Sequence, residues 1–182
     1  MRWIDKRFAE LSLVQLYAIL ALRQQVFVVE QACAYLDADG LDPLCDHLFA
    51  EGSADPPAAA TAAVAAHEPS VQAAAEPSAE TAAAQSAGEL LAYLRILPAL
   101  PEEVRIGRVI IAPPARGLGL GRQLMQRGLA LAHARYGPVP VRISAQAHLE
   151  RFYAGLGFVR ASENYEEDGI PHLAMLRPAG AA

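Results

Sequence analysis

The sequence predicts a mixed α/β fold, in which a twisted, partly parallel central sheet carries helices on both faces. Two patterns predict it. Short apolar runs follow one another in the first half of the chain as they do in hairpins, and strand-like runs alternate with a helix in the second half. A length of 182 residues suits one compact unit, so we expect residues 1–182 to form a single domain.

The first helix is predicted by a capping box. Ser12 is followed three residues later by Gln15, and Leu11 and Leu16 stand where a hydrophobic staple would be. The helix should begin there and run to about Val26. Apolar residues recur along it at helical spacing and are expected to pack on the sheet: Leu13, Leu16, Tyr17, Leu20 and Phe27.

A hairpin with a long insertion comes next. Its strands are expected at 47–50 and 89–95, on either side of a segment at about 51–87 that is rich in Ala, Pro, Glu, Ser and Thr and contains no aromatic residue. Prolines interrupt this segment, and it has little apolar area to offset the entropy cost of ordering. We expect a disordered insertion in the domain.

The second half of the chain predicts strand–helix–strand structure. Strand-like runs lie at 105–112, 141–145 and 172–176, and a helix is expected at about 120–134. Apolar residues four apart predict the buried face of this helix: Leu120, Leu124, Met125 and Leu129.

A glycine loop joins the strand at 105–112 to this helix. Gly117, Gly119 and Gly121 allow consecutive backbone N–H groups to turn toward one point, and the positive end of the helix dipole adds to them. A P-loop would need Lys and then Ser or Thr after the last glycine, where Arg122 and Gln123 stand, and a dinucleotide fingerprint would need glycine at the sixth place rather than the fifth. A tight connection without a ligand remains a third interpretation of the loop.

Two motifs in this half resemble those of the GNAT superfamily of N-acetyltransferases. Arg116, Gly119 and Gly121 match its R-x-x-G-x-G signature. Further on, the family pattern N-x-x-A-x-x-x-Y followed by a G-F pair is matched at Tyr153, Gly157 and Phe158, with Gln146 and Leu149 in place of the usual Asn and Ala. Four blocks, at 22–31, 35–42, 47–48 and 167–175, are similar to the ElaA-like branch.

The resemblance implies the acyl-CoA N-acyltransferase fold and transfer of an acetyl group from acetyl-CoA to a primary amine by direct attack. In the family Tyr153 would be the general acid near the thiol, and backbone N–H groups of the strand before the loop would stabilise the oxyanion. The expected cofactor-binding residues are Val109, Ile110, Ile111, Arg116, Gly117, Leu118, Gly119, Leu120, Gly121, Arg122, Gln146, Phe152 and Tyr153.

The general base has three candidates, His47, His172 and Glu30, because members of the superfamily use different carboxylates or histidines. Each has a structural alternative. His47 could pair within its strand, His172 could hydrogen-bond Asp168, and Glu30 could be solvated. The sequence does not choose among them.

The acceptor is expected to be a small-molecule or peptide amine. Acidic residues at 37–46 and 166–168 would favour a cationic amine, whereas Arg23 and Arg95 would favour a carboxylate. The expected acceptor-binding residues are Arg23, Tyr35, Asp37, Arg95 and Asp168. The alternative to an enzyme is a catalytically silent acyl-CoA-binding sensor or interaction module.

Composition narrows the function classes. A net charge of −5 and an isoelectric point near 5.5 argue against nucleic acid as a partner. The absence of a long apolar run leads us to expect no membrane association and a cytoplasmic location, with Cys33 and Cys45 reduced. The spacing of Cys, Asp and His around residues 33–47 fits neither an EF-hand nor a zinc site, so no metal is expected. The chain is expected to be a monomer or homodimer.

Overall fold

The protein is described here by a computed structural model for residues 1–52, 88–98 and 103–180. The described residues form one sheet, in which the order of the strands is β1-β2-β3-β4-β5-β8-β6 and β7 pairs with β8. Its strands are β1 (Arg2–Arg7), β2 (Asp46–Glu51), β3 (Leu90–Leu97), β4 (Val104–Ile111), β5 (Val141–Gln146), β6 (Val159–Arg160), β7 (Tyr165–Glu167) and β8 (Ile170–Arg177). The predicted insertion at 51–87 lies, except for its first two residues, outside the described residues.

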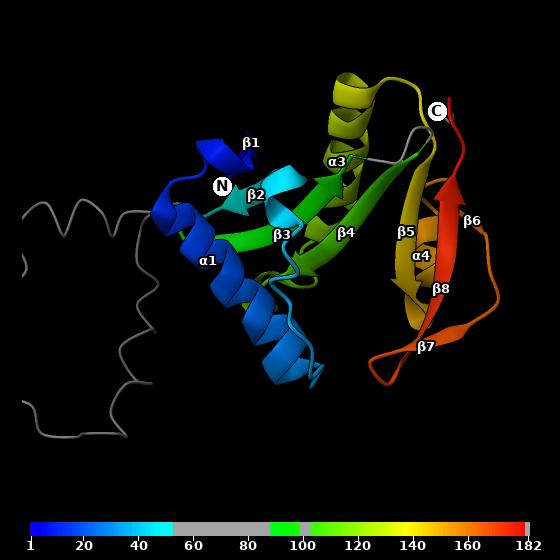
Figure 1. Ribbon diagram of the computed structural model, residues 1–182, viewed down its shortest axis with the longest axis horizontal. Helices are drawn as coiled ribbons and strands as arrows, with labels where there is room; N and C mark the ends of the chain where they lie inside the picture. Colours follow the sequence, from blue (N-terminus) through cyan, green and yellow to red (C-terminus); the bar gives the residue numbers. More distant parts are fainter. Residues whose placement is uncertain (53–87, 99–102, 181–182) are drawn as a thin grey trace, which may run out of the picture.

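The sheet is mixed because β4 and β5 are parallel while the other neighbouring strands are antiparallel. Their pairing is short. Val104 lies opposite Val141 and Arg105 opposite Arg142, and beyond this point the two strands separate (Figure 1). The sheet therefore splits between β4 and β5, and the split determines where a ligand can enter.

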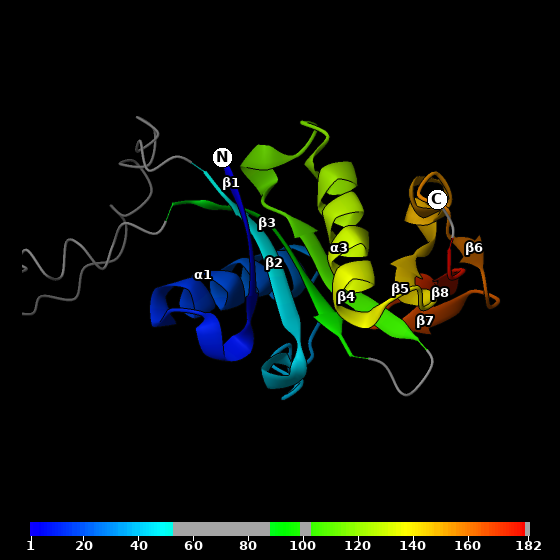
Figure 2. The same cartoon turned by 90° about the horizontal axis from the view of Figure 1, so that it is seen from above.

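Helices cover both faces of the sheet, as the sequence predicted. Helix α1 (Leu13–Arg23) and its continuation η2 (Gln24–Glu30), a π-helix, lie on one face of β2–β4, and α3 (Leu120–Tyr136) lies on the opposite face (Figure 2). The short helix α4 (Glu150–Ala154) packs near β5 on the α3 side. Short 3-10 turns complete the described chain: η1 (Phe8–Glu10), η3 (Asp42–Leu44), η5 (Pro113–Ala115) and η6 (Ala147–Leu149).

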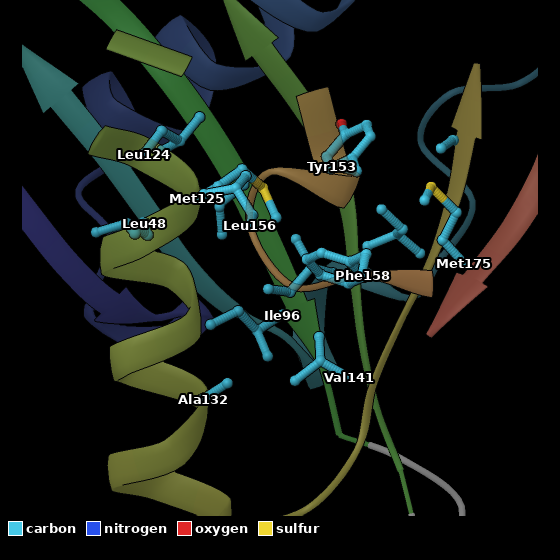
Figure 3. Close-up of a cluster of buried hydrophobic side chains, with 14 of the residues drawn as sticks. Leu48, Ile96, Leu124, Met125, Ala132, Val141, Tyr153, Leu156, Phe158 and Met175 are labelled. Carbon is cyan, nitrogen blue, oxygen red and sulfur yellow. The ribbon is translucent and has the colours of Figure 1, made fainter. Parts of the chain in front are cut away.

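The core has one cluster on each face of the sheet. On the α3 face, Leu124 and Met125 pack with Leu156 and Phe158, and Tyr153 lies at the edge of this cluster (Figure 3). On the α1 face, Ile19, Leu22 and Val26 pack with residues of β2, β3 and β4, including Phe49, Tyr93 and Ile110. The predicted buried face of α3 is confirmed, with Leu129 at its partly buried edge.

The predicted buried face of the first helix was wrong in part. The capping box is present, with Ser12 Oγ accepting from the amide of Gln15 at 3.2 Å. However, Leu13 is 85% exposed and Tyr17 is 78% exposed, and the helix packs instead through Ile19, Leu22, Arg23 and Val26. Apolar residues occur on more than one side of this helix, so periodicity alone could not select the side that meets the sheet.

The expectation that no segment has the length and composition of a membrane span was also wrong. Among the described residues, the 18-residue stretch Leu13–Glu30 passes that test. In this structure the stretch lies against the sheet through Ile19, Leu22 and Val26, and it contains Arg23, which is buried and paired with aspartates.

Candidate active site

A cavity of about 1070 Å³ lies where β4 and β5 separate. Its walls come from both strands, from η2 and the segment after it, from α4, and from β7 and β8. A smaller cavity of about 460 Å³ adjoins it at the start of α3. Every expected cofactor-binding residue except the exposed Leu118 lines one of the two cavities.

The smaller cavity is formed by the glycine loop. Gly117 and Gly119 have φ angles of +78° and +74°, a left-handed conformation that favours glycine. Gly119 is the N-cap of α3, and no side chain caps the helix. The first N–H groups of an α-helix have no partner within the helix, so those at the start of α3 face a cavity that Arg116 and Arg122 also line. This arrangement is able to hold a phosphate group.

A β-bulge interrupts β4 at the larger cavity. Tyr93 of β3 pairs with Ile110, and Arg95 pairs with Gly107, so two residues of β4, Arg108 and Val109, lie opposite one residue of β3. Arg108 has a φ of 55°, which fits such an irregularity. A bulge leaves its extra residue out of the ladder. The backbone there is available to a ligand, close to the predicted oxyanion donors at Val109, Ile110 and Ile111.

Tyr153 lies in α4 with its ring between two aromatic neighbours. It makes edge contacts to Phe152 and Phe158, with ring centroids 5.0 Å and 5.9 Å away. Burial raises the pKa of its hydroxyl to about 12. No described residue hydrogen-bonds this hydroxyl, and Tyr153 lines the larger cavity. The phenol is thus held neutral and open to a bound molecule.

Three arginines and three aspartates form an ion-pair cluster beside the cavity. Arg23 binds Asp37 and Asp42, Arg95 binds Asp39 and Asp42, and Arg108 binds Asp37 and Asp39. The cluster is balanced in charge. The expected acceptor residues Arg23 and Asp37 are among its buried members and do not line the cavity, whereas Arg95, Tyr35 and Asp168 do.

Arg108 adds a packing role to this cluster. Its guanidinium lies over the rings of Phe27 and Tyr35, at 5.8 Å and 5.3 Å from their centroids, and its Nε donates to Asp37 at 2.6 Å. The bulge in β4 is therefore tied to the segment that follows η2. Sequence reasoning missed this residue, because nothing local distinguishes it from a solvated strand arginine.

The three candidate bases occupy different environments. His47 is buried away from the cavity, with Nδ1 2.8 Å from Tyr93 Oη and Nε2 3.0 Å from the carbonyl of Asp42. Glu30 lines the cavity but accepts two hydrogen bonds from Arg116, at 2.7 Å and 2.8 Å, which hold its pKa below the usual value.

His172 lines the cavity from β8, and its tautomer follows from its partner. Its Nδ1 lies 2.8 Å from the carbonyl oxygen of Ile170. A carbonyl oxygen only accepts, so Nδ1 carries a proton, and in the neutral imidazole the lone pair is on Nε2. The ring is stacked on Tyr165, with centroids 6.3 Å apart. The hydrogen bond that the sequence allowed to Asp168 is made to Ile170 instead.

A polar chain that sequence reasoning missed lies next to His172. Ser144 Oγ donates to Glu167 Oε2 at 3.0 Å and shares a hydrogen bond of 2.6 Å with Tyr165 Oη. Because the single Ser144 proton goes to the carboxylate, Tyr165 is the donor in the second bond. The only sequence signal was an acidic run at 166–168, which does not reveal that these side chains reach β5.

Gln146, which replaces the family asparagine, connects the two sides of the cavity. It ends β5, and its Nε2 donates to Gln31 Oε1 at 3.1 Å, just beyond the end of η2. Both glutamines line the cavity. The contact joins β5 to the α1 side of the split.

Sequence comparisons identify the class of protein to which this site belongs. Residues 50–177 match the acetyltransferase (GNAT) domain, and the chain belongs to that family. The family resemblance read from the glycine loop and the Tyr-Gly-Phe motif is confirmed.

Within the family the chain is similar to ElaA. It is 38% identical to Protein ElaA of Escherichia coli (strain K12) over 179 residues, which cover 97% of this chain and 96% of ElaA. The crystal structure of Escherichia coli ElaA matches with a TM-score of 0.75 over 97% of this chain and 99% of that one. An acyl-CoA N-acyltransferase from Pseudomonas aeruginosa matches with 39% identity, the same TM-score and the same coverage.

The fold is shared more widely. An aminoglycoside 6′-N-acetyltransferase in complex with coenzyme A matches with a TM-score of 0.59 over 95% of both chains, at 12% identity. The predicted mixed sheet with helices on both faces is thus confirmed as the fold of this family.

Proposed function

We propose that this protein transfers an acetyl group from acetyl-CoA to the primary amine of an acceptor by direct attack. The observation that carries the proposal is the cavity at the β4–β5 split, because the β4 bulge and Tyr153 line it, and it shares lining residues with the cavity at the glycine loop. Membership of the acetyltransferase family supports it.

The residues present fit acetyl-CoA. The uncapped start of α3 would bind the pyrophosphate through the amides of the glycine loop, with Arg116 and Arg122 adding positive charge. From there the larger cavity leads along β4 to the bulge and Tyr153. When bound, the thioester supplies an electrophilic acetyl carbon.

Acetyl transfer needs three groups of the protein: an oxyanion donor, a general acid and a general base. The amine nitrogen would first bond to the acetyl carbon, and a backbone N–H at the Val109 bulge would stabilise the oxyanion that results. Collapse of this oxyanion would then break the carbon–sulfur bond. Tyr153 would donate a hydrogen bond and then its proton to the leaving sulfur. Nε2 of His172 would accept the proton that the amine loses, since it is the candidate base with both cavity access and a free lone pair.

Replacing Tyr153 by Phe tests the assignment of the acid. The ring packing is retained and only the hydroxyl is lost, so kcat for acetyl transfer to a panel of primary amines should fall about 100-fold or more. The Kd for acetyl-CoA should change less than about twofold, because the removed hydroxyl would act in the transition state and not in the binding of acetyl-CoA. Tyr17→Phe, on the exposed side of α1, is the matched control.

Two outcomes would count against the proposal. An unchanged kcat in Tyr153→Phe would remove this tyrosine from the chemistry. Saturable acetyl-CoA binding without transfer to any amine would favour the silent acyl-CoA-binding module instead.

A further inference from the structure

The acceptor side of the cavity has a polar floor formed by alternate residues of β5. Val141, Ile143 and Ala145 are buried in the core on the α3 face. Arg142, Ser144 and Gln146 therefore point to the opposite face, and all three line the larger cavity. This floor lies beside the segment of β4 that carries the bulge.

One end of the floor is cationic. Arg105 and Arg142 lie directly opposite each other in the last pair of the β4–β5 ladder, and both line the cavity. Like charges at opposed positions are unfavourable unless something compensates them. The carboxylate between them is Glu103, which accepts from Arg142 Nε at 2.8 Å and lies 3.5 Å from Arg105 Nε.

Among the described residues, these two guanidinium groups share one carboxylate, which leaves one positive charge in excess. Both hydrogen bonds that Arg142 makes to the described residues start at Nε, so its two Nη atoms donate to none of these residues. The Arg105 side chain is 56% exposed. The other three cavity arginines do not provide this excess, because Arg95 and Arg108 belong to the balanced cluster with aspartates and Arg116 pairs with Glu30.

The other end of the floor is anionic. Ser144 stands two residues along β5 from Arg142 and donates to Glu167, and Asp168, the next residue, lines the same cavity. Alternate residues of a strand are separated by roughly 7 Å. An ammonium group held by Glu167 would lie beside His172 and the split, where the amine has to react.

We propose that the acceptor is a small molecule that carries a carboxylate several bonds away from its primary amine. Arg105 and Arg142 bind the carboxylate, and Glu167 with Ser144 receives the amine. This inference rests on the proposed acetyl transfer and specifies its acceptor. The amine end meets the reaction centre, and the carboxylate end lies at the closed end of the split.

The test compares two probes that differ only in charge, 6-aminohexanoate and 6-aminohexanamide. Calorimetry on the full chain measures the binding of each probe, and initial rates with acetyl-CoA measure transfer to each. The carboxylate probe should bind and react about tenfold to a hundredfold better, as expected for a charge-assisted contact. Arg105→Gln should reduce the difference to less than about threefold, as should Arg142→Gln.

Arg160→Gln is the matched control, because Arg160 is also an exposed, ion-paired strand arginine but lies on β6 outside the cavity lining. It should leave the preference intact. Circular dichroism and thermal melting of each variant separate a lost contact from a lost fold.

The possible failures are distinguishable. Equal binding of both probes, no saturable binding of 6-aminohexanoate, or a preference that survives both cavity variants would overturn the carboxylate site. Equal acetylation of both probes would do so while leaving the proposed function standing. Carboxylate-dependent binding without transfer would overturn the proposed function but would still support the carboxylate site.

Discussion

His47 and His172 show how the environment of one residue type decides its chemistry. His47 is buried, with a partner at each ring nitrogen, so it has no atom left for a substrate. His172 keeps a free Nε2 at the cavity wall. The sequence offered both as bases, since a lone histidine carries no signal of burial; the difference comes from Tyr93 and Asp42 on one side and from the β7–β8 turn on the other.

The burial of His47 predicts a pH-dependent stability. Burial lowers its pKa in the folded protein below the usual 6.5, so the unfolded chain binds a proton first as the pH falls. Stability attributable to neutral His47 is complete above pH 6.5 and is lost below it, with a slope approaching about 1.4 kcal/mol per pH unit. Urea denaturation between pH 7.5 and 5.5, followed by the fluorescence of Trp3, measures this slope.

His47→Gln should be less stable at pH 7.5 but should show a shallower loss of stability on acidification. His133→Gln, at an exposed position of α3, is the control and should keep the wild-type slope. Equal slopes in the wild type and His47→Gln would show that another group causes the acid sensitivity.

At the scale of elements, the features that depend on neighbouring residues were predicted correctly, whereas the pairing of residues far apart in the sequence was not. The capping box, the five strands expected from 47–50 to 172–176, the glycine loop and the buried face of α3 follow from neighbouring residues, and the structure contains all of them, whereas β1 and β7 were not predicted. The segment after η2 was interpreted as an acidic acceptor mouth. Its aspartates instead pair with arginines up to 71 residues away, on α1, β3 and β4. Only the folded sheet brings those charges together.

Asp42 is the member of this cluster on which two buried arginines depend. Its Oδ1 accepts from Arg23 at 2.8 Å and from Arg95 at 2.7 Å. Burial raises its pKa, but these two hydrogen bonds outweigh burial, and the pKa is lower than usual. Asp42→Ala should therefore cost about 3–5 kcal/mol of unfolding free energy, because it removes one of the two carboxylates that pair with each of two buried guanidinium groups.

Asp39→Ala is the comparison for that variant. Because Asp39 is more exposed, its replacement should reduce the unfolding free energy clearly less. Guanidinium chloride denaturation measures the unfolding free energy of both variants. A loss below about 1 kcal/mol in Asp42→Ala, or equal losses in the two variants, would contradict a structural role for the cluster.

At the scale of the whole molecule, the proposed function depends on a sheet that opens between its two parallel strands. The donor side follows from the sequence, because the glycine loop and the Tyr153 motif are each continuous in the chain. The acceptor side does not, since Arg105, Ser144 and Glu167 come from β4, β5 and β7 and become neighbours only through the strand order. The family resemblance could therefore indicate the type of reaction but not the identity of the acceptor.

The central claim is that acetyl-CoA enters this split with its pyrophosphate at the start of α3, and calorimetric titration tests it most directly. Acetyl-CoA should bind the wild type saturably, and Gly119→Glu should abolish binding. A glutamate there has to adopt a left-handed conformation and brings negative charge to the phosphate cradle. Gly137→Glu, which has the same substitution at a left-handed glycine at the other end of α3, should still bind acetyl-CoA. No binding by the folded wild type, or undiminished binding by folded Gly119→Glu, would contradict the account.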